Sequence, residues 1–171
     1  MSKDNYKKAL LIRNAFLSLT SLFIVLELVI MFQLNQPIKI IIEDMSTEEE
    51  LFVQEVEYGE RFEVNYIHSV ERSPVSEIFE VRSDGIYTME SRTESFGAGM
   101  PYEGDDVEIK DGTFIIKNIN RKVHGGTLRI RPSSVFPHHI IIGKTDIVIS
   151  DAPYKGKNLE VKLIKSYFRG D

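Results

Sequence analysis

The stretch Arg61–Arg82 reads RFEVNYIHSVERSPVSEIFEVR and contains two runs of alternating apolar and polar residues. Side chains on a β-strand point alternately to its two faces, so a period of two predicts a strand. One face of the first run is apolar except for His68, and one face of the second is apolar except for Glu77. The stretch therefore predicts an antiparallel hairpin with one face turned toward a core.

The register of this hairpin follows if the four residues Glu71–Pro74 form its loop. His68 then lies opposite Glu77, with Cβ atoms about 5 Å apart, and the apolar pairs are Val70–Val75, Tyr66–Phe79 and Val64–Val81. A slip of one residue would turn the apolar set outward, so burial favours this register. We expect a buried pair in which the two ionised forms stabilise each other. The pair is either a structural polar contact within the core, or it lines a pocket and acts on a ligand.

Short runs of the same period continue from residue 38 to residue 165, with Asp-Gly turn signals at 84–85 and 111–112. Closely spaced strands without a long helix indicate two packed sheets or a barrel. The expected fold is all-β, an antiparallel β-sandwich or partly open barrel over residues 38–171. One helical turn is expected at Met45–Glu50. The expected strands are Ile38–Ile42, Leu51–Val56, Arg61–Val70, Val75–Arg82, Ile86–Ser91, Asp106–Lys110, Thr113–Ile119, Thr127–Arg131, His139–Ile142, Asp146–Ser150 and Leu159–Lys165.

An apolar run, Ala15–Phe32, precedes the β region, and Leu10–Ile12 extends it upstream. About 20 apolar residues cross the core of a bilayer. We therefore expect residues 10–32 to span a membrane, and residues 1–37 to form a short cytoplasmic tail and transmembrane anchor. A cleaved signal peptide is the rival interpretation, but its apolar region would be shorter and would end at a small-x-small site, which is missing here.

The charges around this run predict its orientation. Positively charged flanks stay in the cytoplasm, and the residues before the run include Lys3, Lys7, Lys8 and Arg13. We expect a single pass through the cytoplasmic membrane, with the N-terminus inside and the C-terminal domain outside. Glu27 lies within the run, where a carboxylate usually faces a partner or water. It either contacts another membrane helix or reaches toward the outer interface.

Composition narrows the possible functions. The 171 residues include no Cys, so disulfides, thiolate zinc sites and thiol nucleophiles are excluded. The net charge is −5, and residues 1–37 hold four basic and two acidic residues, so residues 38–171 carry −7. An acidic domain argues against nucleic acid, which requires a basic patch. The adjacent His138 and His139 point to opposite faces of a strand, so we expect no metal site and no cofactor.

Two further segments are candidates for a site. The segment Ser95–Tyr102 reads SFGAGMPY, and Gly97 and Gly99 within it allow close backbone approach or positive φ. It is either an ordered turn or an anion site made of free N–H groups. Arg129 lies on the outer face of its strand, as a solvated side chain or as a carboxylate clamp.

The hairpin segment YIHSVERSPVSE, residues 66–77, and the segment SFGAGMPY together resemble a family of small bacterial proteins of unknown function. The motifs shared with that family are His-Ser-Val-Glu and Phe-Gly-Ala-Gly-x-Pro, and the resemblance spans roughly Tyr58–Ile149. Its members are typically encoded beside, and sometimes fused to, the membrane components of TRAP transporters of the TAXI subgroup. Those transporters use an extracytoplasmic binding protein and a sodium-coupled membrane unit to take up organic acids.

The resemblance implies a non-enzymatic accessory protein of a TAXI-type TRAP transporter that acts on the outer face of the membrane. Its partners would be the membrane component or the solute-binding protein of that transporter. Glu27 would pack on the transporter, and a shared pocket or contact surface would contain His68, Glu77, Gly97, Gly99 and Arg129. The alternatives are a small extracytoplasmic enzyme with His68 and Glu77 as acid/base pair, and a free-standing assembly factor.

Overall fold

The computed structural model describes residues 3–34, 37–94 and 106–165. The chain divides into two compact units, residues 1–36 and residues 37–171. The first contains the helix α1 (Lys3–Leu34), in which Leu11–Phe32 is long and apolar enough to cross a membrane. At a rise of 1.5 Å per residue its 22 residues span about 33 Å, slightly more than the apolar core of a bilayer.

Polar side chains inside this apolar helix bond to the helix itself. The hydroxyls of Ser18, Thr20 and Ser21 each donate to the carbonyl three residues earlier, at 2.9 Å. Such a bond satisfies the hydroxyl without water. Three of the polar residues in the stretch are therefore compatible with a hydrocarbon environment.

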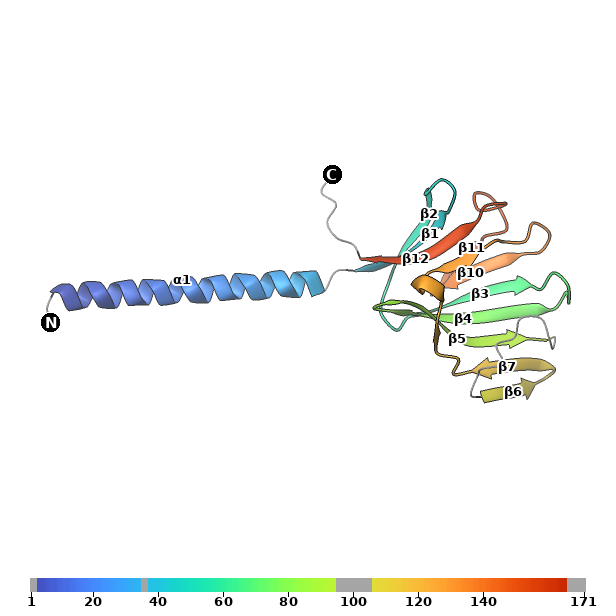
Figure 1. The fold of residues 1–171 in the computed structure, drawn as a ribbon, viewed down its shortest axis with the longest axis horizontal. Coiled ribbons are helices and arrows are strands. Elements are labelled where there is room, and N and C mark those ends of the chain that lie inside the picture. The colour runs from blue at the N-terminus through green and yellow to red at the C-terminus, as the bar shows by residue number, and fades with distance from the viewer. Residues whose placement is uncertain (1–2, 35–36, 95–105, 166–171) are drawn as a thin grey trace. The chain divides into compact units, whose positions relative to one another are not determined.

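The second unit is built from two antiparallel sheets (Figure 1). The short sheet has the order β2-β1-β12-β9, with β2 at Glu50–Val56, β1 at Ile38–Asp44, β12 at Leu159–Lys165 and β9 at Leu128–Ile130. The long sheet has the order β11-β10-β3-β4-β5-β7-β6. Its strands are β11 (Thr145–Val148), β10 (His138–Ile142), β3 (Arg61–Ile67), β4 (Pro74–Arg82), β5 (Gly85–Thr93), β7 (Thr113–Lys117) and β6 (Asp106–Lys110). The two-residue strand β8 (Arg121–Lys122) also pairs with β5, and a 3₁₀ turn, η1, follows at His124–Gly126.

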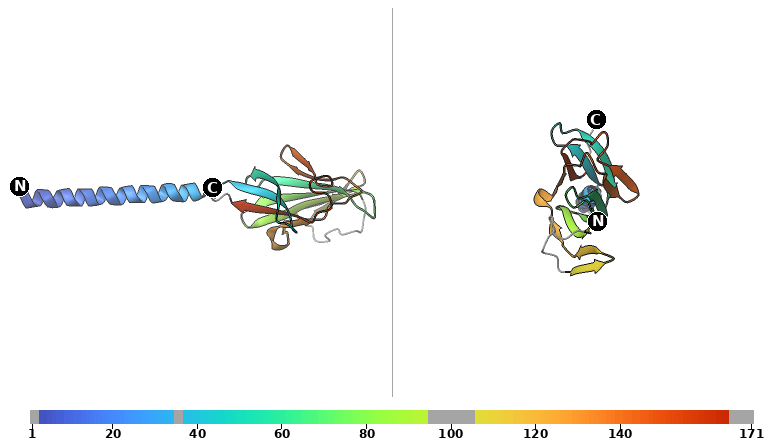
Figure 2. Two further views of the ribbon diagram at one scale, coloured as in Figure 1. Left: turned by 90° about the horizontal axis from the view of Figure 1, so that it is seen from above. Right: turned by 90° about the vertical axis from the view of Figure 1, so that its right-hand side faces the viewer.

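The core lies between the two sheets, because strands of both contribute to one cluster of buried apolar residues. Figure 2 shows the strands from above and end-on. Alternate residues of each strand supply the core, as the period of two requires. From the short sheet come Ile38, Ile40, Ile42, Val56, Leu159 and Val161, and from the long sheet and its margins come Phe62, Val64, Phe79, Val81, Ile86, Ile140, Ile142, Ile147 and Ile149. Among the described strands neither sheet closes on itself, so the predicted all-β sandwich is confirmed and a closed barrel is not formed.

All eleven expected strands are found, and those at Asp106–Lys110 and Leu159–Lys165 have the predicted bounds. The short strand β8 was not predicted, since two residues carry no periodic signal. The helical turn expected at Met45–Glu50 is wrong. Residues 45–47 form a tight turn instead, and β2 begins at Glu50.

The predicted register of the β3–β4 hairpin is wrong by four residues. Tyr66 pairs with Val75, not Phe79, and Val64 lies opposite Glu77. Because four is an even shift, the predicted faces are retained and the apolar face still points to the core. Phe62 now lies opposite Phe79, and their rings stack at 5.3 Å between centroids, a contact that the predicted register would lose.

The error arises at the hairpin turn, where β3 ends at Ile67 rather than at Val70. The His68 imidazole turns back on its own loop, and its Nδ1 accepts a hydrogen bond from the Glu71 N–H at 3.2 Å. The His68 N–H donates to the Ser73 carbonyl at 2.9 Å, which closes the turn before Pro74. A local bond from side chain to backbone thus competes with the strand.

Candidate functional site

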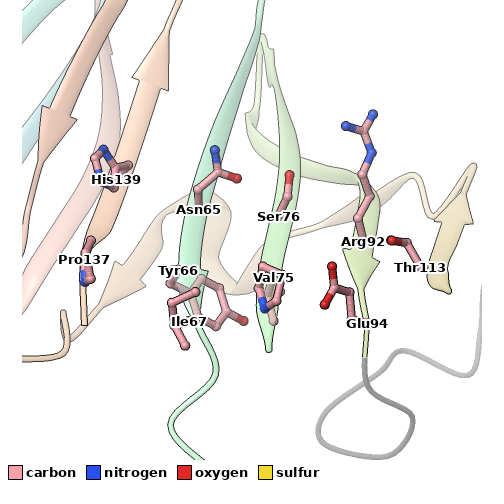
Figure 3. A pocket seen from close by; sticks show the side chains of 11 residues that line it. Asn65, Tyr66, Ile67, Val75, Ser76, Arg92, Glu94, Thr113, Pro137 and His139 are labelled. Atoms are coloured by element: carbon pink, nitrogen blue, oxygen red, sulfur yellow. The ribbon is translucent and has the colours of Figure 1, made fainter. Parts of the chain in front are cut away.

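A groove of about 410 Å³ lies on the outer face of the long sheet. Four neighbouring strands each place one polar side chain along it, and the register pairs His139 with Asn65, Asn65 with Ser76, and Ser76 with Arg92. We call these four residues the polar row (Figure 3). Apolar side chains of Ile67, Pro74 and Pro137 line the groove beside the polar row, and Glu94 and Thr113 complete the lining with Tyr66 and Val75.

Three members of the polar row bond to carboxylates. His139 Nδ1 lies 2.8 Å from Asp146 Oδ1, and Ser76 Oγ–H donates to Glu63 Oε1 at 2.5 Å. Arg92 Nε–H donates to Glu90 Oε1 at 2.6 Å. With Glu94, four carboxylates line or adjoin the groove against the guanidinium of Arg92. The Lys117 ammonium also lies near Glu90, but it is paired with Glu108 at 2.6 Å. The local potential is therefore negative, because like charges along one face add.

Asn65 is the fourth member of the polar row and lies at its centre, on β3 between β10 and β4. Its Oδ1 is buried and has no hydrogen-bond donor among the residues that the structure describes. A buried carbonyl without a donor destabilises a fold by about 1–3 kcal/mol. The groove therefore keeps an acceptor that the described part of the domain does not satisfy, which is unusual in a folded protein.

The inner face behind the groove carries Glu77 and two aromatic rings. Glu77 lies on β4 between Val64 and Ser91, and burial raises the pKa of its carboxyl, although the charge of Arg121 acts in the opposite direction. Burial and the nearby Glu77 charge raise the pKa of Tyr66 to about 12. The Tyr66 ring stacks on His138 at 4.8 Å between centroids. Desolvation thus disfavours charge on this inner face.

His138 is held neutral by the same burial. Desolvation lowers the pKa of its imidazole, with a smaller effect from the neighbouring His139. Its Nδ1 accepts from the Ser133 N–H at 3.2 Å, and its backbone N–H donates to Ser150 Oγ at 3.2 Å. His138 therefore acts as a core residue that anchors the loop before β10, whereas His139 points outward into the groove, as predicted for neighbours on a strand.

Replacing Glu77 with Gln should stabilise the domain at neutral pH. The raised pKa means that the folded state favours the protonated acid, so stability falls as pH rises from about 4.5 through the raised pKa. The glutamine removes this loss, and we expect a higher Tm at pH 7 with little change at pH 4. Thermal unfolding followed by circular dichroism at both pH values measures the difference.

Glu80 on the same strand is the matched control for this prediction. Hydrogen bonds from Arg82 and then Arg61 hold the pKa of its carboxyl below its usual value. Glu80→Gln should therefore lower the Tm at pH 7, the opposite sign. If Glu77→Gln lowers the Tm at pH 7 as Glu80→Gln does, the burial argument for Glu77 is wrong.

The structure separates the residues expected to form one site. His68 is aligned with Ser73, so Glu77 lies four residues further along β4, about 13 Å away. The predicted His68–Glu77 pair is therefore wrong. Arg129 lies on the outer face of the short sheet, where its Nε–H donates to Glu160 Oε1 at 3.0 Å. Gly97 and Gly99 lie outside the described residues. Glu27 lies exposed within α1.

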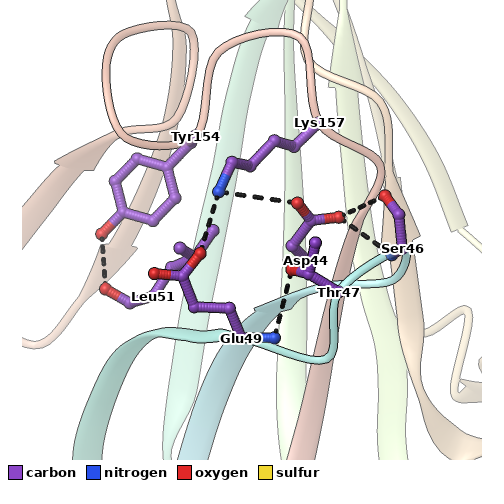
Figure 4. A network of polar contacts seen from close by, with 7 residues as sticks. All are labelled: Asp44, Ser46, Thr47, Glu49, Leu51, Tyr154 and Lys157. Atoms are coloured by element: carbon purple, nitrogen blue, oxygen red, sulfur yellow. Dashed lines mark hydrogen bonds and ion pairs between the residues drawn. The ribbon is translucent and has the colours of Figure 1, made fainter.

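A second polar cluster joins the turn after β1 to the loop before β12 (Figure 4). The buried Asp44 carboxylate accepts the N–H and Oγ–H of Ser46 at 2.9 and 2.6 Å, and these bonds hold its pKa below its usual value. Lys157 Nζ lies 3.5 Å from Asp44 and 3.3 Å from Glu49, while the Tyr154 hydroxyl donates to the Leu51 carbonyl. Each of these groups has a partner, so the cluster holds two loops together.

The polar row was not predicted from the sequence. Its members come from four strands, and only the true register brings them into line. The predicted register would have placed Asn65 opposite Glu80 instead of Ser76. The available signal was the polar outer face of the hairpin, which carries Asn65 and Ser76. Among the described residues no group of three or more His, Asp or Glu side chains is placed to hold a metal ion.

Comparison with known proteins identifies the family. No curated protein and no solved structure matches the chain significantly. A family model described as a domain of unknown function, DUF1850, matches residues 62–149, from β3 to the residue after β11. The match includes the hairpin and every residue that lines the groove. Because it covers more than half of the 171 residues, the chain belongs to the DUF1850 family.

Proposed function

We propose that this protein is a non-enzymatic accessory protein of a TAXI-type TRAP transporter for organic acids. In this proposal α1 spans the cytoplasmic membrane once, with the N-terminus inside, and the β domain acts on the outer face. The observation that carries it is the helix: within the part of the chain that the structure describes, no residue of Leu11–Phe32 is buried. An apolar surface of this size requires lipid or another membrane helix.

The transporter is proposed from the motif pair. The segments YIHSVERSPVSE and SFGAGMPY resemble bacterial proteins associated with TAXI-type transporters, and most of the hairpin segment forms β3, its turn and β4. The expected partners are the membrane component, which α1 would contact near Glu27, and the solute-binding protein. The β domain would contact one of these two proteins on the outer side of the membrane.

The groove supports a binding role rather than an enzymatic one. The Ser76 hydroxyl is two strands away from His139, about 9–10 Å, and it already donates to Glu63. A nucleophile and its base must lie within hydrogen-bond reach, so these two residues form no catalytic pair. His68 and Glu77, the alternative acid and base, do not face each other either.

The proposed orientation can be tested because the chain contains no Cys. A single Cys replaces Ser134, which is exposed in the β domain, or Lys7, which is exposed before the apolar stretch. We expect a membrane-impermeant maleimide to label the position 134 variant in intact cells, and the position 7 variant only after permeabilisation. The reverse pattern would place the domain in the cytoplasm and refute the proposal.

The proposed partnership is tested by co-purification. The full chain, tagged at its C-terminus, is extracted in mild detergent from bacteria that also produce a TAXI-type transporter. We expect the membrane component or the solute-binding protein to co-purify, and a chain whose α1 is replaced by an unrelated single-span helix to retain less of the membrane component. Absence of every transporter subunit from the full-length sample would refute the accessory role.

A further inference from the structure

We infer that the groove on the long sheet binds the ammonium or guanidinium group of a lysine or arginine side chain on a partner protein. This inference names the chemistry of the proposed contact, and it rests on the proposed function for the presence of a protein partner on the outer side. The groove does not hold the organic acid itself. The charges of the groove and its hydrogen-bond acceptors both favour a cation over a carboxylate.

The charge argument starts from the bonds of the polar row. Its guanidinium, on Arg92, is paired with Glu90 at 2.6 Å, so this charge is offset within the sheet. Among the described residues Glu63 accepts only from the Ser76 hydroxyl, and none bonds to Glu94. A carboxylate ligand would meet these acids with no free cation in the described lining to bind it, whereas a cation would meet complementary charge.

Hydrogen bonding points to the same ligand. Asn65 Oδ1 is an acceptor without a donor among the described residues, and Glu94 offers two more acceptor oxygens. Lysine and arginine heads carry only donors. Their methylene stems would pack on Ile67, Pro74 and Pro137, since such stems bury well against apolar surface.

Apolar residues beside the groove favour a protein over a free amine. The turn after β3 and the segment before β10 each lead into a residue that lines the groove. Val70 in that turn and Val135 in that segment have 76% and 78% of their surface exposed. A basic side chain in a groove flanked by exposed apolar residues is the usual composition of a protein contact. A second copy of this chain is disfavoured, because residues 38–171 carry a net charge of −7.

The test uses the full chain in detergent micelles and side-chain probes of defined charge. The probes are N-acetyl-lysine methylamide and N-acetyl-arginine methylamide, with the norleucine analogue as neutral control and succinate as anionic control. We expect a basic probe to shift the amide resonances of Asn65, Ser76 and His139 with a millimolar Kd, and the two controls to leave them unchanged. Equal shifts from norleucine, or stronger shifts from succinate, would overturn the inference.

Two variants make the test specific. Glu94→Gln should weaken binding of the basic probe roughly threefold, as expected for an exposed ion pair. Glu55→Gln makes the same charge change at an exposed position of β2 and should leave binding unchanged. Asn65→Val should weaken probe binding while raising the Tm, because it removes the oxygen that lacks a donor. If Asn65→Val changes only the Tm and Glu94→Gln matches Glu55→Gln, the groove is not a binding site.

The outcomes separate this inference from the proposed function. Co-purification of a transporter subunit with no response of the groove to basic probes would overturn the inference and leave the accessory role standing. A response to basic probes without co-purification would refute the accessory role and leave the chemistry of the groove established. Weaker subunit retention in Glu94→Gln, with retention unchanged in Glu55→Gln, is the result expected if both are correct.

Discussion

A chain cut to residues 62–149, the span of the family match, should not fold. The cut removes β1, β2 and β12, which are three of the four strands of the short sheet. Seven of the sixteen core residues are lost with them: Ile38, Ile40, Ile42, Val56, Tyr154, Leu159 and Val161. The inner face of the long sheet would then lie open to water. Each large core side chain contributes about 1.5–3 kcal/mol by burial, so the loss exceeds the total stability of a typical domain.

The control for this truncation is residues 37–171, which retain both sheets. Dispersion in the ¹H–¹⁵N NMR spectrum and cooperative thermal unfolding measure the fold of each chain. We expect a dispersed spectrum for residues 37–171 and a collapsed one for residues 62–149. A dispersed spectrum and a cooperative transition in the shorter chain would show that the long sheet is stable without its cover, and the account of the core would be wrong.

Gly85→Ala should destabilise the domain by about 4 kcal/mol, from backbone strain together with overpacking. Gly85 begins β5 with φ at +140°, a conformation open only to glycine. A Cβ at this position would lie 2.7 Å from the Gly126 Cα and 3.0 Å from its carbonyl oxygen. Gly126 ends the 3₁₀ turn that leads into β9, so the clash would push apart the segment that connects the long sheet to the short one.

Gly59→Ala is the matched control. Gly59 also has positive φ, at +86°, but no described atom lies within 4 Å of the place that an added Cβ would take. Only backbone strain remains there, about 1 kcal/mol. Urea unfolding of both variants measures the difference. Equal losses of stability would mean that Gly85 and Gly126 are not in contact, and that the connection between the sheets differs from the one described.

Much of the fold follows from local signals in the sequence. The alternation of apolar and polar residues, together with turn signals such as Asp111-Gly112, predicted eleven strands and the bounds of β6 and β12. The apolar stretch predicted at residues 10–32 corresponds to Leu11–Phe32 of α1. These signals depend on residues a few positions apart, and tertiary context does not override them here.

The hairpin register depended on information that the periodicity lacks. A period of two fixes which face each residue takes, and it is unchanged by a shift of two or four residues. The stack of Phe62 on Phe79 and the local bond from Glu71 N–H to His68 Nδ1 decide between these registers. Both contacts depend on side-chain geometry, so the sequence pattern could not select them.

The candidate site depends on pairing between strands that lie far apart in the sequence. The polar row needs the order β10-β3-β4-β5, in which a strand from late in the chain inserts beside β3. No pattern in the sequence pairs His139 with Asn65, because 74 residues separate them. The pattern of the hairpin pointed instead to His68 and Glu77, the polar residues on its otherwise apolar face. One of them closes a turn, and the other lies half-buried on the inner face.

The register of the β3–β4 hairpin is the central claim, because the polar row and the groove exist only in that register. Cross-strand nuclear Overhauser effects between backbone protons of the full chain measure it most directly. The account predicts contacts that join Val64 to Glu77, Asn65 to Ser76, and Tyr66 to Val75. Contacts that join Tyr66 to Phe79 and His68 to Glu77 would contradict it and would restore the buried histidine–glutamate pair.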